Sequence, residues 1–123
     1  MTEKSGAWRK ASPELVERFE AAVAGIEGLE QRQMFGYPAA FVGGNMVTGL
    51  HQESWLVRLG ADERSALADQ GWQTFSPMPG RPMREYLTLP EGIAADRRAA
   101  RSWVERAAAY GRTLPPKPPR KSR

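Results

Sequence analysis

Three short apolar segments, separated by turns of two or three residues, restrict the fold of this chain more than any other feature. The segments cover residues 34–42, 46–51 and 54–59. The turns between them are Gly43-Gly44-Asn45 and Gln52-Glu53. Connections this short join neighbouring antiparallel strands, because a parallel crossover needs about a dozen residues or more. The sequence therefore predicts three consecutive strands paired antiparallel.

Apolar residues at helical spacing predict helices on both sides of these strands. Ser12 is a suitable N-cap for the first helix, and Gly28 can supply the left-handed residue that ends it. A short helix is predicted at 62–70. Asp96 caps the last helix, which Gly111 is expected to end.

Two further strands, at 72–75 and 83–89, complete the predicted order α-β-β-β-α-β-β-α. This order is typical of an α+β domain in which helices pack against an antiparallel sheet. Pro38 lies inside the first apolar segment. Because proline has no backbone N–H to donate, it predicts a bend or an edge position there.

The chain of 123 residues has the length of one domain, which we expect at 12–111, between an N-terminal arm (1–11) and a Pro/Lys/Arg-rich, disordered tail (112–123). The net charge of +4 is unevenly distributed. The tail has five basic residues and no acidic one, whereas residues 11–111 have ten basic and thirteen acidic residues. The folded body is thus mildly acidic, which argues against a nucleic-acid groove on the domain itself.

Several kinds of site are excluded by residues that the chain lacks. Cysteine is absent, which excludes disulfides, thiolate catalysis and cysteine zinc sites and fits a reducing, cytoplasmic setting. His51 is the single histidine, so a metal site with two histidines is excluded. No apolar run approaches about 18 residues, so no membrane span is expected. We expect no cofactor.

Four segments resemble a known family, the TfoX/Sxy N-terminal domain. They are Met34-Phe35-Gly36-Tyr37, Arg81-Pro82-Met83-Arg84-Glu85-Tyr86, Trp103-Val104-Glu105-Arg106-Ala107 and Leu114-Pro115-Pro116-Lys117. The resemblance covers residues 12–119 and is closest to the short, stand-alone members. It implies a fold like that of type III secretion chaperones and YjbR-like proteins. The founding members of the family regulate competence genes by assisting a transcription factor, and the resemblance implies no catalytic residue set.

His51 and Tyr37 are candidate binding residues. His51 is the only side chain whose ordinary pKa is near neutrality, and Glu53, two residues on, could orient it as a proton acceptor. A polar residue beside a solvated turn is the alternative interpretation. Tyr37 belongs to one of the motifs above, and its alternative is an ordinary place in the core.

Arg81 and Arg84 are the sharper candidates. Pro79, Gly80 and Pro82 restrict the backbone around Arg81, which lowers the entropy lost when its guanidinium is presented to a carboxylate or phosphate. The alternative is a structural loop whose arginine charges pair within the fold.

The leading functional hypothesis is a non-enzymatic protein-interaction or regulatory module, monomeric or homodimeric, that binds another protein through a sheet face or the loop around Arg81. One alternative is weak nucleic-acid binding by basic residues of the tail, namely Lys117, Arg120, Lys121 and Arg123. Another is a small-molecule site or enzyme that uses His51 or the Arg81/Arg84 pair.

Overall fold

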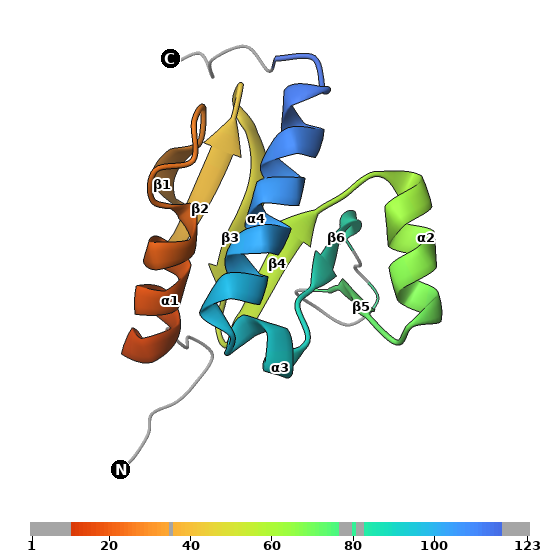
Figure 1. The fold of residues 1–123 in the computed structure, drawn as a ribbon, viewed down its shortest axis with the longest axis horizontal. Coiled ribbons are helices and arrows are strands. Elements are labelled where there is room, and N and C mark those ends of the chain that lie inside the picture. The colour runs from red at the N-terminus through yellow and green to blue at the C-terminus, as the bar shows by residue number, and fades with distance from the viewer. Residues whose placement is uncertain (1–10, 35, 77–79, 81–82, 117–123) are drawn as a thin grey trace.

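An α+β domain is built around a six-stranded antiparallel sheet (Figure 1). The computed structural model describes residues 11–34, 36–76, 80 and 83–116. The strands are β1 Glu30–Met34, β2 Tyr37–Val42, β3 Asn45–His51, β4 Ser54–Arg58, β5 Gln73–Phe75 and β6 Met83–Thr88, in the spatial order β1-β2-β3-β4-β6-β5. The helices are α1 Pro13–Val23, α2 Ala61–Asp69, α3 Glu91–Ala94 and α4 Arg97–Arg112. The predicted fold class is confirmed.

The structure adds two elements to the predicted order. The first is β1, whose five side chains are exposed except for the half-buried Met34. The sequence of this strand has no alternation of apolar and polar residues, so it has the pattern of a loop and does not predict a strand. The second is the four-residue α3, which connects β6 to α4. The predicted strand at 34–42 accordingly starts later, at Tyr37, because Met34 belongs to β1.

Pro38 lies in an inner strand, so the predicted edge position is wrong. β2 pairs with β1 on one side and with β3 on the other. Pro38 faces Gln33 of β1, whereas pairing with β3 begins only at Ala39, opposite Gly49. Pro38 is therefore beyond the last residue of β2 that pairs with β3, where its missing N–H interrupts no ladder.

The two predicted N-caps are confirmed, but the two predicted helix ends are wrong. The Ser12 hydroxyl accepts a hydrogen bond from the Leu15 amide, and the Asp96 carboxylate accepts from two amides of α4. The first helix ends at Val23, ahead of Gly25 at φ +77°, so Gly28 lies in a later turn. α4 continues through Gly111 to Arg112. Gly111 is not a cap but a packing residue, since it lies against the sheet where a side chain would not fit.

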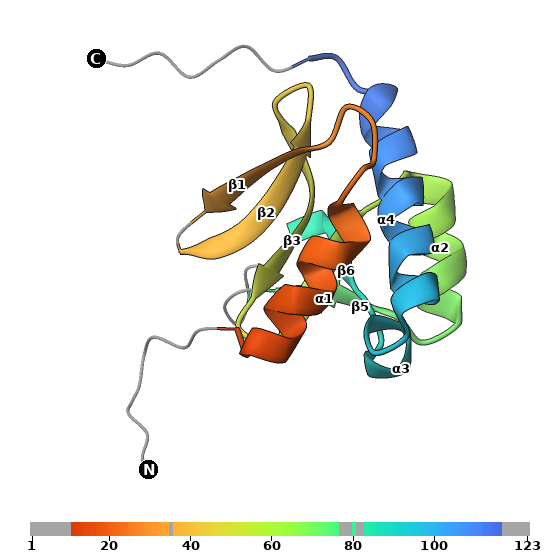
Figure 2. The same cartoon turned by 60° about the vertical axis from the view of Figure 1, so that its left-hand side comes forward.

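The main core lies between one face of the sheet and the helices α1 and α4 (Figure 2). Its most deeply buried side chains come from helices and strands alike, among them Phe19, Val57 and Val104. Thr48 is the buried polar residue in this region. Its hydroxyl donates to the Leu56 carbonyl (2.8 Å) and accepts from Trp55 Nε1 (3.0 Å), which satisfies all three groups.

The described helices include none that combines the length and the apolar character required to cross a bilayer.

Candidate functional site

The second face of the sheet, on which no described helix packs, holds a smaller apolar cluster. Leu56, Phe75 and Tyr86 are buried there, with Met46 against them. Antiparallel pairing puts Ala39 and Phe41 of β2 on this face as well, since they are opposite Gly49 and Met46. Two of the candidate residues predicted from the sequence belong to this face.

His51 and Tyr37 are brought together on this face of the sheet. The ring centroids of Tyr37 and His51 are 5.3 Å apart, and those of His51 and Phe75 are 5.4 Å apart. The half-buried imidazole thus packs between two aromatic rings. The carboxylate of Glu53 accepts a hydrogen bond from the Ser12 amide (2.9 Å) and so holds the start of α1 against the turn between β3 and β4.

Arg84 is exposed on β6 and takes no part in the ion pairs found within the described ranges. Arg81 lies outside the described residues, as do Lys117, Arg120, Lys121 and Arg123. In the part of the chain that the structure describes, no three His, Asp or Glu side chains gather as ligands of a metal ion would.

Arg58 and Tyr86 form a pair on the same face that the sequence does not reveal. They are opposite each other on β4 and β6, with the guanidinium carbon 5.7 Å from the ring centroid. The Tyr86 hydroxyl donates to the Met46 carbonyl (2.8 Å). Burial raises the pKa of the Tyr86 phenol, and the nearby Arg58 charge partly offsets the rise. Finding the pair requires the strand register, which the sequence does not contain.

The outer edge of the sheet is formed by β1. On this strand Arg32 lies over the ring of Phe41, 5.1 Å from its centroid, and pairs with Glu30 at 3.3 Å. β1 packs mainly against β2, and Figure 2 shows it away from α2 and α4.

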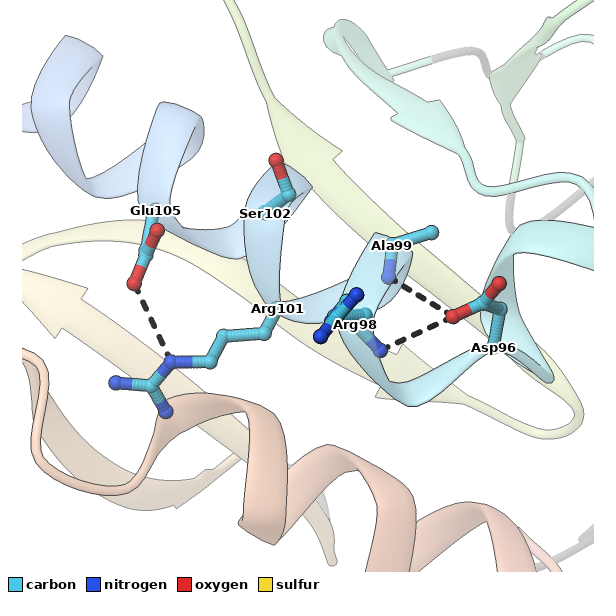
Figure 3. A pocket seen from close by; sticks show the side chains of 6 residues that line it. All are labelled: Asp96, Arg98, Ala99, Arg101, Ser102 and Glu105. Carbon is cyan, nitrogen blue, oxygen red and sulfur yellow. Dashed lines mark hydrogen bonds and ion pairs between the residues drawn. The ribbon is translucent and has the colours of Figure 1, made fainter.

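Two adjoining depressions lie on the helical side of the molecule. One, of about 550 Å³, follows α4 and is shown in Figure 3. There the Asp96 carboxylate accepts from the Arg98 and Ala99 amides (both 3.1 Å), and Arg101 pairs with Glu105 (3.2 Å). The other, of about 250 Å³, is bounded by both α1 and α4 and is lined by Arg18, Ala21, Ala22, Arg97, Arg98 and Arg101.

Arg101 also joins the two helices directly. Its Nη1 donates to the carbonyl of Ala24 at 2.8 Å, and it lies 3.4 Å from the carbonyls of Ala21 and Ala22. These are carbonyl groups of the last turn of α1, which have no partner inside their own helix. Arg101 therefore stabilises the end of α1.

Comparison with known proteins supports the resemblance seen in the sequence. A search of curated proteins found no match. The family model described as the TfoX N-terminal domain matches residues 21–110, from the second half of α1 to the last turn of α4. Because this match spans most of the chain, the protein belongs to the TfoX N-terminal domain family.

Proposed function

We propose that this protein is a non-enzymatic interaction module that binds an extended segment of another protein along the outer edge of β1. The observation that carries the proposal is the exposure of this strand, which pairs with β2 on one side and presents its other side to solvent. Binding by strand addition uses such an edge, since backbone hydrogen bonds supply affinity and alternate side chains supply specificity.

The pairing of β1 with β2 determines which backbone groups face outward. Met34 and Tyr37 close a two-residue connection, and the closing pair of such a hairpin exchanges hydrogen bonds. Hydrogen-bonded and non-bonded pairs then alternate along the ladder. The N–H and C=O groups of Gln33 and Gln31 therefore point away from β2, toward an incoming strand.

The side chains of β1 set the chemistry of the partner. Charged residues on an edge strand discourage indiscriminate pairing. Arg32 is oriented by Phe41 and by Glu30, which reduces the entropy lost when it meets a partner. The best partner places an acidic residue opposite Arg32 and a basic residue opposite Glu30.

Family membership supports a regulatory partner. The resemblance to regulators of competence genes implies action through a transcription factor rather than by catalysis.

Packing of His51 between Tyr37 and Phe75 supports a structural role for that imidazole. The lack of cysteine supports a cytoplasmic setting.

The test is a partner capture followed by a measured affinity for the captured protein. The variant Gln31→Pro/Gln33→Pro loses two backbone N–H groups, and both of them point away from β2. An edge strand tolerates proline at such positions. The control Gln31→Thr/Gln33→Thr changes the same side chains but keeps both N–H groups. We expect the proline variant to lose at least about tenfold in affinity and the threonine variant to bind nearly as well as the wild type.

Two results would contradict the proposal. If wild-type protein and the proline variant recover the same background proteins, the module has no partner at this edge. If a partner binds the proline variant normally but is lost with Arg84→Ala, the interaction uses the region of β6 and the loop before it instead of β1.

A further inference from the structure

We propose that a cluster of arginines between α1 and α4 binds the phosphoryl group of a small phosphorylated metabolite. We call this cluster the arginine pocket and define it by Arg18 of α1 and Arg97, Arg98 and Arg101 of α4. This site includes no residue of β1 and is independent of the function proposed above.

The pocket is bounded by two helices. Its volume is about 250 Å³, and Ala21 and Ala22 line it together with the arginines. Their small side chains allow a ligand to approach the helices closely. Beside it, the depression in Figure 3 shares Arg98 and Arg101 with the arginine pocket and adds the hydroxyl of Ser102.

Two of the four arginines are fixed by partners within the fold. Arg97 Nη2 donates to both carboxylate oxygens of Glu17, at 2.9 and 3.0 Å. Arg101 donates to Glu105 through Nε and to the Ala24 carbonyl through Nη1. Their guanidinium groups are held in place before any ligand arrives, which reduces the cost of binding.

The other two arginines form no ion pair within the described residues. Within the described residues, the side chains of Arg18 and Arg98 make no hydrogen bond or ion pair. The third acidic residue nearby, Asp96, already accepts from the Arg98 and Ala99 amides, so it caps the helix and leaves the guanidinium of Arg98 free. Two of the four guanidinium groups in the arginine pocket thus keep their N–H donors available for an anion.

The arrangement fits a phosphoryl group better than a carboxylate. A carboxylate is planar, and one guanidinium fork satisfies it. A phosphoryl group carries up to two charges and has oxygens in three directions, so it can accept from Arg18 on one helix and Arg98 on the other. Arginine is also the residue that best matches phosphate geometry.

The experiment follows the Nε–Hε signals of the arginines by NMR during titration with inorganic phosphate. We expect saturable shifts of the Arg18 and Arg98 signals, and no such shifts when chloride is added to the same ionic strength. A nucleoside monophosphate should give the same shifts, and the nucleoside without its phosphate should give none. Arg18→Gln/Arg98→Gln should weaken phosphate binding at least about tenfold.

Matched variants separate binding from folding. Arg106→Gln removes an exposed arginine of α4 that lines neither depression, and this variant should bind phosphate as the wild type does. The double variant should melt, without phosphate, at the wild-type temperature or slightly above it, because it removes two like charges. Non-saturating shifts, equal shifts in chloride, or unchanged binding by the double variant would each overturn the proposal. Binding of a single-stranded oligonucleotide with no binding of the monophosphate would also overturn it.

Discussion

Gly111 of α4 approaches Val47 of β3 so closely that a Cβ atom at position 111 would lie 2.5 Å from Val47 Cγ1. The same Cβ would lie 3.2 Å from Val42 Cβ. Val47 is fully buried and has no room to move aside. The distance between the last helix and the sheet therefore depends on the absence of a single methyl group.

The substitution Gly111→Ala should lower the free energy of unfolding by about 1–3 kcal/mol, the usual cost of overpacking a core. Chemical denaturation followed by circular dichroism measures it. Gly92→Ala is the matched control, because a Cβ at that helical position meets nothing within 4 Å. The control should be neutral or stabilising by up to about 1 kcal/mol. Equal effects of the two substitutions would contradict the packing argument.

Thr48→Val tests the buried hydroxyl that links β3 to β4. Valine has nearly the same shape but leaves Trp55 Nε1 and the Leu56 carbonyl without this partner. We expect a loss of about 1–3 kcal/mol in unfolding free energy, together with a change in tryptophan fluorescence. Thr74→Val, at an exposed position of β5, should change the free energy by less than about 0.5 kcal/mol. A stable Thr48→Val protein with unchanged fluorescence would refute the role of the hydroxyl.

Tyr86 should make stability depend on pH in the alkaline range. Burial raises the pKa of its phenol above the value of about 10 expected in the unfolded chain. The native state then keeps the proton that the unfolded state releases, so the unfolding free energy is unaffected below about pH 10 and falls as pH rises above it. Tyr86→Phe should remove this part of the fall.

At neutral pH, Tyr86→Phe should also cost about 1 kcal/mol through loss of the hydrogen bond to Met46. Urea titrations at several pH values, compared between wild type and variant, measure both effects. Parallel curves up to pH 11 would show that Tyr86 does not titrate differently in the two states.

Fewer basic C-terminal residues are available to contact nucleic-acid phosphates than the five counted in the sequence. Arg112, counted with the tail, is the last residue of α4 and donates to the Glu27 carbonyl (2.7 Å). Four basic residues then remain for phosphate contacts, so the salt dependence on duplex DNA should have a log–log slope no steeper than about −3.6. A slope near −4.5, or binding that survives deletion of residues 117–123, would contradict this expectation.

The elements that could be predicted are those whose signals are local. The short turns at 43–45 and 52–53 require neighbouring antiparallel strands by geometry alone, and β2, β3 and β4 are adjacent in the sheet in that order. Ser12 and Asp96 cap their helices through contacts within three residues. The strand β1 lacked such a signal, because its stability comes from pairing with β2 and not from a buried face of its own.

The candidate sites depend on contacts between distant residues, which explains why only part of them could be predicted. Tyr37 and His51 could each be proposed, but their contact requires the alignment of β2 and β3. Arg18 and Arg98 are 80 positions apart and line the same pocket only because α1 packs on α4. From the sequence, the arginines of the last helix have the pattern of a solvated surface. The pattern of one helix does not show which other helix packs beside it and completes the pocket.

The position of α4 has a consequence for biosynthesis. This helix covers β2, β3 and β4 and also packs on α1, so it closes the core as the last regular element of the described chain. While the ribosome is still translating it, the apolar sheet surface that it will cover is open to water and to other nascent chains. Completion of the domain must therefore wait for release of residues up to 112 from the exit tunnel, and ribosome stalling before that point would leave an aggregation-prone intermediate.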